Sequence, residues 1–179
     1  GLVFTPPSSL NPSSYAHVIR EALPGVTPNI VHYITDVLYP PVYNGSYGYT
    51  NSIGRMALTI SDLSFQCNTD YLNRAFHGDT YAYMFSIPPG LHGQDVSYTF
   101  YDGGSSSVLN TTVALVMQDY FTSFAQAGKP TSRVGPEFEM YGDHSRLLNL
   151  GLSDITTIKD PTDNVRCLFW QQVPYYRGD

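Results

Sequence analysis

The sequence predicts part of an α/β fold: mostly helices, few strands, and a sheet completed by residues outside the chain. Apolar residues recur with helical spacing along much of the 179 residues, whereas only residues 80–86 clearly resemble a strand. One strand cannot form the central sheet of an α/β domain, so the helices must cover strands supplied from elsewhere. The long loops at residues 101–109 and 129–149 agree with a chain that does not fold alone. We therefore expect residues 1–179 to form one portion of a single domain, without an internal boundary.

The N-terminal part of the chain predicts two helices. Ser13 or Ser14 is a suitable cap for a short helix that ends before Pro24. Thr27 is a suitable N-cap for a second helix, because a proline follows it at the first helical position. Pro40 marks the end of this second helix, since a proline cannot continue the hydrogen-bond pattern.

Two longer helical segments follow. Residues 52–75 have helical spacing with a break expected near Cys67, and Gly78 stops the segment. Residues 112–127 place most of their large apolar side chains on one face, and Gly128 is a typical C-terminal stop.

The remaining segments are less regular. A last helix is expected from about residue 160 through Trp170 to residue 173. Val96, Tyr98 and Phe100 alternate with polar residues, which favours a strand at that point.

Composition and charge exclude several classes of partner. The formal net charge is −6, and the nine Lys and Arg residues are not clustered, which argues against nucleic acid or an anionic membrane surface. No apolar run approaches the roughly 20 residues of a membrane-spanning helix. Residue 1 opens no signal peptide, so any targeting segment is expected in a missing N-terminal part.

The most informative residue is His92. The strand-like residues 80–86 enter a rigid turn at Pro88, Pro89 and Gly90, which places His92 on a loop at the C-terminal end of a strand. A catalytic histidine in this position requires a nucleophile, and a serine nucleophile is commonly exposed by a Gly-x-Ser-x-Gly turn. The sequence contains no such run.

Five motifs in one order identify a family. The motifs are Ile53-Gly-Arg-Met-Ala-Leu-Thr-Ile-Ser-Asp-Leu-Ser-Phe-Gln-Cys67, Tyr81-Ala-Tyr-Met-Phe85, His92-Gly-Gln-Asp95, Tyr120-Phe-Thr-Ser-Phe-Ala-Gln-Ala-Gly-Lys-Pro130 and Cys167-Leu-Phe-Trp170. Together they resemble the C-terminal part of a type-B carboxylesterase, the cholinesterase and fungal lipase family of α/β-hydrolases. The run around His92 most resembles secreted fungal esterases. The resemblance covers nearly the whole chain and implies the C-terminal part of an α/β-hydrolase fold. It also implies a short helical turn at residues 96–100, in place of the strand that the alternation there favours.

The resemblance assigns roles residue by residue. His92 matches the triad histidine, which accepts the serine proton and returns it to the leaving alcohol. Asp95 matches an acidic position that supports the histidine loop in relatives but is not itself a member of the triad. Gly1 resembles the residue that directly follows the triad glutamate in relatives. Serine and acid are therefore expected in the missing N-terminal part, present as a separate chain.

The resemblance also bears on covalent structure. Cys67 and Cys167 fall at positions that form a disulfide in many relatives, the alternative being two buried free thiols. Asn44 and Asn110 each begin an Asn-x-Ser/Thr sequence in a polar stretch and are candidate glycosylation sites. With the resemblance, these features favour a secreted protein. Residues 44–48 (Asn-Gly-Ser-Tyr-Gly) also resemble the Gly-x-Ser-x-Gly turn of a serine nucleophile, but they lack its first glycine.

The other histidines and the aromatic residues have simpler interpretations. His77 also precedes a glycine, but it is expected at the opposite end of the strand from His92. His17, His32 and His144 have no partner at metal-ligand spacing, and no cofactor is expected. Most aromatic residues should form core or interface, although four near the histidine loop are candidates for lining an acyl or alcohol pocket: Tyr83, Phe85, Tyr98 and Phe100.

Three functions remain open from the sequence. The first is a portion of a serine carboxylesterase or lipase that acts on a small-molecule or lipid ester. The second is a non-catalytic cholinesterase-like binding or adhesion domain. The third, a self-sufficient structural subunit, would need a complete core that the pattern does not show.

Overall fold

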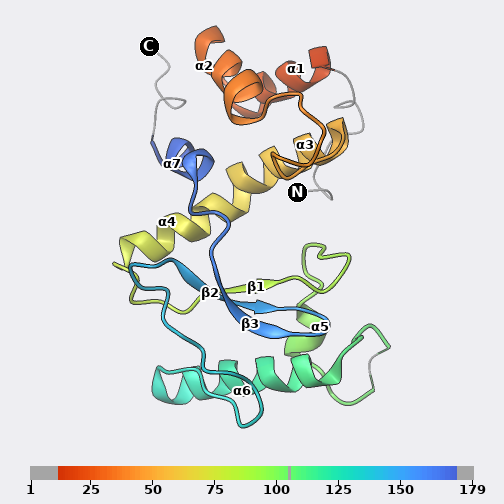
Figure 1. Cartoon of the computed structure of the whole chain (residues 1–179), viewed down its shortest axis with the longest axis vertical. Coiled ribbons are helices and arrows are strands. Elements are labelled where there is room, and N and C mark those ends of the chain that lie inside the picture. The colour runs from red at the N-terminus through yellow and green to blue at the C-terminus, as the bar shows by residue number, and fades with distance from the viewer. Residues whose placement is uncertain (1–11, 105, 173–179) are drawn as a thin grey trace. The chain divides into compact units, whose positions relative to one another are not determined.

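The computed structural model describes residues 12–104 and 106–172, which fall into two compact units. Unit 1 combines residues 1–72 with residues 162–179, and unit 2 comprises residues 73–161. Figure 1 labels the elements of both units. Gly1, which the resemblance places next to the triad acid, lies outside the described residues. The organisation as a single domain stays a prediction.

Unit 1 is helical, and the N-cap predicted at Thr27 is confirmed. The cap expected at Ser13 or Ser14 is wrong, because α1 already includes both residues. The side-chain oxygen of Thr27 accepts a hydrogen bond from the Ile30 amide at 3.5 Å, and that of Asn51 accepts one from the Gly54 amide at 2.8 Å. These contacts satisfy amide groups that a helix leaves open at its start. The helical elements are α1 (Pro12–Ala22), α2 (Pro28–His32), η2 (Tyr33–Leu38), α3 (Ser52–Ser61), η3 (Asp62–Gln66), α4 (Cys67–Ala75) and α7 (Val165–Gln171), and α4 continues into unit 2.

Two of these elements, η2 and η3, are π-helical turns. The break expected near Cys67 is wrong as an interruption, because η3 joins α3 and α4 in one continuous helical path. A π turn changes the hydrogen-bond pattern from four to five residues and so rotates the faces of the helices on either side. The loss of regular spacing before Cys67 in the sequence corresponds to this change of helix type.

A buried polar network joins three elements of unit 1. The hydroxyl of the fully buried Tyr39 donates to Asp62 Oδ2 and accepts from Trp170 Nε1, each at 2.8 Å. Arg55 Nε donates to the backbone oxygen of Tyr39 at 2.7 Å. Arg166 Nε forms an ion pair with Asp62 Oδ2 at 3.1 Å without hydrogen-bond geometry. Burial raises the pKa of the Asp62 carboxyl, and the charge of Arg166 offsets part of this rise.

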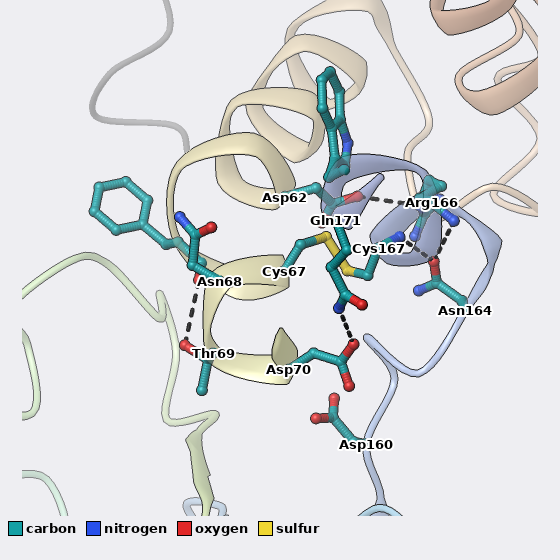
Figure 2. Close-up of a disulfide and its surroundings, with 12 residues drawn as sticks. Asp62, Cys67, Asn68, Thr69, Asp70, Asp160, Asn164, Arg166, Cys167 and Gln171 are labelled. Atoms are coloured by element: carbon teal, nitrogen blue, oxygen red, sulfur yellow. Dashed lines mark hydrogen bonds and ion pairs between the residues drawn. A yellow bond between two sulfur atoms is a disulfide. The ribbon is translucent and has the colours of Figure 1, made fainter. Parts of the chain in front are cut away.

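The disulfide that the resemblance implies lies beside this network. Cys67 and Cys167 are joined, with their Cα atoms 4.8 Å apart, and Figure 2 shows the bridge between α4 and α7. Asn164 Oδ1 caps α7 by accepting from the amides of Arg166 and Cys167 at 2.8 and 3.3 Å. The expected helix start near residue 160 is therefore wrong, and residue 173 lies outside the described part.

Unit 2 contains a sheet of three strands, of which the sequence predicts only the first. β1 (Tyr83–Phe85) pairs in parallel with β2 (Arg146–Leu150), and β2 pairs in antiparallel with β3 (Ile155–Lys159). The registers align Tyr83 with Leu148 and Leu148 with Thr157. The loop predicted over residues 129–149 is wrong at its end, where β2 begins.

Two helices cover this sheet in unit 2. Of the two alternatives at residues 96–100, the strand is wrong and the short helical turn is confirmed, since α5 (Val96–Thr99) is a short helix. The longer α6 (Thr111–Ala127) ends at Gly128, which has a φ of 68°. In Figure 1, α6 runs along one face of the sheet. The buried residues of this layer are Ile87, Tyr98, Val113, Ala114, Val116, Met117, Tyr120, Phe138, Leu148 and Leu150.

Among the described residues, no helix combines the length and the apolar character that a membrane span requires.

Candidate active-site loop

The loop that carries His92 begins at the carboxyl end of β1. Its first residue, Ser86, donates its amide to Leu150 O at 3.1 Å and its hydroxyl to Asn149 Oδ1 at 2.6 Å. Ile87 is fully buried in the core of unit 2. The loop therefore leaves the sheet at the carboxyl edge of the parallel pair β1 and β2, which is where open α/β sheets place their ligand sites.

His92 lies in the exposed part of this loop. Glycines on either side, Gly90 and Gly93, have φ values of 66° and 78°, a region that favours residues without a side chain. The Gly90 amide donates to Ile87 O at 2.9 Å, and the Val96 amide donates to Gly93 O at 3.2 Å. His92 therefore lies between two tight turns, one that begins at the buried Ile87 and one that leads into α5.

Gln94 bridges the two sides of the same loop. Its Oε1 accepts from the Leu91 amide at 3.1 Å, and its Nε2 donates to Pro88 O at 3.1 Å. The Gln94 amide also donates to Leu91 O at 3.1 Å. His92 lies within the segment that these three hydrogen bonds close.

Asp95 connects the loop to the strand below it. The hydroxyl of Tyr83, on β1, donates to Asp95 Oδ2 at 3.0 Å. Burial, together with this hydrogen bond and the negative charge of Asp95, raises the pKa of Tyr83 to about 12. The backbone oxygen of Asp95 accepts the first amides of α5, from Tyr98 and Thr99, at 3.1 and 2.9 Å. The supporting role of Asp95 toward a catalytic histidine stays a prediction.

The four aromatic residues near the loop have different positions. Tyr98 is fully buried, and its ring packs against that of Phe85 with centroids 5.0 Å apart, so both belong to the core. Phe100 is 77% exposed. Tyr83 lines an apolar pocket of about 210 Å³, formed with Tyr81, Tyr120, Phe121, Phe124, Pro130 and Phe138.

His77 lies on a different surface, between the end of α4 and the start of β1. It has a φ of 54°, and it lines a polar pocket of about 270 Å³ with Asn73, Arg74, Gly78, Tyr141, Gly142, Asp143 and Ser145. The placement of His77 at the opposite end of β1 from His92 agrees with the sequence. In the described part of the chain, no three His, Cys, Asp or Glu side chains are grouped to hold a metal ion.

The two candidate glycosylation sites differ in their hydrogen bonds. Asn44 is exposed, and its Oδ1 accepts from the amide and the hydroxyl of Ser46 at 3.0 and 2.6 Å. Asn110 is the N-cap of α6, where its Oδ1 accepts from the Thr112 amide at 2.9 Å. The Nδ2 of Asn110, the atom to which a glycan would attach, donates to Leu152 O at 2.8 Å.

Known proteins resemble this chain over almost its full length, although no protein-family model matches it. Carboxylesterase patB of Penicillium expansum is 32% identical over 176 residues, which are 98% of this chain and 31% of that protein. Carboxylesterase patB of Aspergillus clavatus is 33% identical over 176 residues, 98% of this chain and 32% of that protein. The chain thus spans about a third of the length of these curated relatives.

A solved structure supports the fold. The crystal structure of EstA from Aspergillus niger matches with a TM-score of 0.80 at 19% identity, over 99% of this chain and 39% of that chain. At this identity the likeness shows the fold, which is a partial α/β-hydrolase fold rich in helices with a small sheet of three strands. Taken with the two carboxylesterases, it shows that the chain is a fungal carboxylesterase-like sequence that corresponds to the C-terminal portion of such proteins.

Proposed function

We propose that this chain supplies the triad histidine, His92, of a serine carboxylesterase that hydrolyses carboxylic esters. The observation that supports this role is the position of His92, exposed on a braced loop at the carboxyl edge of the parallel strands. A general base requires this combination, because it must meet substrate and nucleophile while its orientation is fixed from behind. The carboxylesterase relatives support the same chemistry.

The remaining catalytic groups belong to the N-terminal part of the same hydrolase. The sequence has no Gly-x-Ser-x-Gly turn, and the two acids that follow His92 closely, Asp95 and Asp102, come after the histidine in chain order. Asp95 accepts from Tyr83, so its carboxylate is engaged with the strand. The substrate is a small-molecule or lipid ester, the N-terminal part is the partner as a separate chain, and the protein acts outside the cell without a cofactor.

The proposed function predicts that activity requires both parts. Residues 1–179 expressed alone should give no turnover of a p-nitrophenyl ester, whereas the complete hydrolase should hydrolyse it. The complete protein should also react with a fluorophosphonate at one upstream serine, and peptide mapping should locate that serine. The isolated chain should not be labelled, because it lacks the activated nucleophile. Ester turnover by the isolated chain would contradict the proposal.

A non-catalytic binding or adhesion domain is the second candidate function. It is compatible with a carboxylesterase-like fold, since one fold supports many functions. The fluorophosphonate experiment discriminates between the two, because an adhesion domain has no activated serine to label. The braced loop around His92 favours the enzyme: Gln94 and Asp95 hold the segment with three side-chain hydrogen bonds that an inert surface loop does not require.

Secretion predicts glycosylation, and the contacts of the two asparagines favour one site over the other. We expect a glycan at Asn44, whose side chain is exposed and whose hydrogen bonds with Ser46 use Oδ1 and not Nδ2. Asn110 is a poorer acceptor, because its Nδ2 contacts Leu152 O and its Oδ1 caps α6. In protein secreted from a fungal host, glycosidase treatment should lower the mass. Asn44→Gln should abolish most of that shift, and Asn110→Gln should retain it.

A further inference from the structure

We propose that Gln94 is a positioning residue for His92, acting as a clamp across the histidine loop. The inference rests on the proposed function, since it concerns how the general base is held. Gln94 itself is not a catalytic residue, because its side-chain amide hydrogen-bonds to the loop backbone at Leu91 and Pro88. It acts through the path of the chain on both sides of His92.

The clamp follows from what each end of the Gln94 side chain contacts. The Oε1 atom accepts from the amide of Leu91, the residue immediately before His92, at 3.1 Å. The Nε2 atom donates to the carbonyl of Pro88, near the start of the loop, at 3.1 Å. One amide group thus fixes the entry to the loop and the residue next to His92, and both distances are those of ordinary hydrogen bonds.

The chemistry of this position requires one acceptor and one donor on the same planar group. A glutamine amide provides both. An ionised glutamate provides acceptors only, so its second oxygen would face the Pro88 carbonyl oxygen and repel it. A methionine has similar length but lacks both hydrogen bonds. The sequence position therefore selects glutamine for its paired donor and acceptor.

A second connection holds the other side of the loop. Tyr83 on β1 donates to Asp95 Oδ2 at 3.0 Å, directly after Gln94. His92 is therefore held between two side-chain contacts that attach to different parts of unit 2, the loop start and the strand. Loss of the Gln94 contacts leaves the Asp95 contact in place, so the loop should lose its fixed path without unfolding.

A small displacement of a general base lowers kcat more than it raises KM, because the base acts in the chemical step and not in substrate binding. We expect Gln94→Met in the complete hydrolase to reduce kcat on the order of 10- to 100-fold, with KM changed by less than about twofold. Thermal unfolding should remain close to that of the unchanged protein, because Gln94 is only partly buried and lies in a loop.

Gln94→Glu provides a readout that a purely structural role would not change. A free glutamic acid has a pKa of about 4.3, and its protonated form has one O–H donor and one acceptor, which restores the pattern of the amide. The ratio of kcat/KM between this variant and the unchanged enzyme should therefore be low at pH 7 and should rise as the pH falls toward about 4.5. The control Gln126→Glu makes the same charge change on the exposed end of α6 and should give a flat ratio near one.

The outcomes separate the clamp from the proposed function. If His92→Ala retains normal turnover, the proposed function fails. If His92→Ala loses turnover while Gln94→Met keeps kcat within twofold and Gln94→Glu gives a flat ratio, the clamp is wrong and the proposed function stands. A lowered kcat for Gln94→Met together with a pH-dependent recovery of Gln94→Glu supports the clamp.

Discussion

Replacement of both Cys67 and Cys167 by alanine is expected to lower the free energy of unfolding by about 4–5 kcal/mol, measured by denaturant titration of the non-reduced protein. The bridge closes a loop with a sequence separation of 100 residues, and this length sets the entropy that the bridge removes from the unfolded chain. The variant should retain its helical content, because α7 keeps its hydrogen bonds with the rest of unit 1. These are the Trp170 hydrogen bond to Tyr39 and the Gln171 hydrogen bond to Asp70 at 2.6 Å.

Two controls separate the bridge from the loss of side-chain volume. Each single variant, Cys67→Ala or Cys167→Ala, should be destabilised about as much as the double variant, because either change removes the same covalent bond. Peptide mapping without reduction should find a peptide pair that contains both cysteines. Two thiols that react with an alkylating agent in the native protein would contradict the bridge and would remove one reason to place the protein outside the cell.

The sequence identifies helices where local chemistry marks their ends. Thr27 precedes α2 as a side-chain cap, and Gly128 ends α6 in the left-handed conformation that its residue type favours. These signals are local, so they survive without knowledge of the fold. The predicted start of α7 is too early because Asp160 and Pro161 also have the composition of a helix start, whereas the cap is Asn164.

The strands β2 and β3 show where local patterns fail. β2 has the sequence Arg-Leu-Leu-Asn-Leu, whose adjacent leucines at 147 and 148 are both buried in different core clusters, so apolar and polar residues do not alternate along it. β3 contains Ile155, Thr156, Thr157 and Ile158, which are β-prone and were a usable signal. The pairing of β2 with β1 lies outside local sequence range, since this parallel pairing joins residues more than 60 positions apart.

The candidate site divides in the same way. His92 and Asp95 can be selected from the sequence through the motif, and the strand before them locates the loop. The sequence does not single out Gln94, because its hydrogen bond to a backbone carbonyl six positions away depends on the folded path of the loop. The hydrogen bond of Asp95 to Tyr83 likewise joins residues 12 positions apart, on different elements.

His92→Ala in the complete hydrolase is expected to reduce ester turnover on the order of 10⁴- to 10⁶-fold, which is the range for loss of a triad member. Without an imidazole, the serine hydroxyl keeps its proton at neutral pH and the leaving alcohol receives none. Turnover of a p-nitrophenyl ester, measured as kcat and KM, reports the loss. Stability should change little, because the His92 side chain is exposed on a loop whose closing hydrogen bonds come from other residues.

The matched control for this experiment is His77→Asn. His77 also precedes a glycine in unit 2, but it lines the polar pocket near the start of β1 rather than the loop after it. Asparagine is chosen because His77 has a φ of 54°, which asparagine tolerates better than alanine. We expect near-normal turnover from His77→Asn and almost none from His92→Ala. Normal turnover by a folded His92→Ala protein would remove the triad assignment, because the general base would then have to be another group.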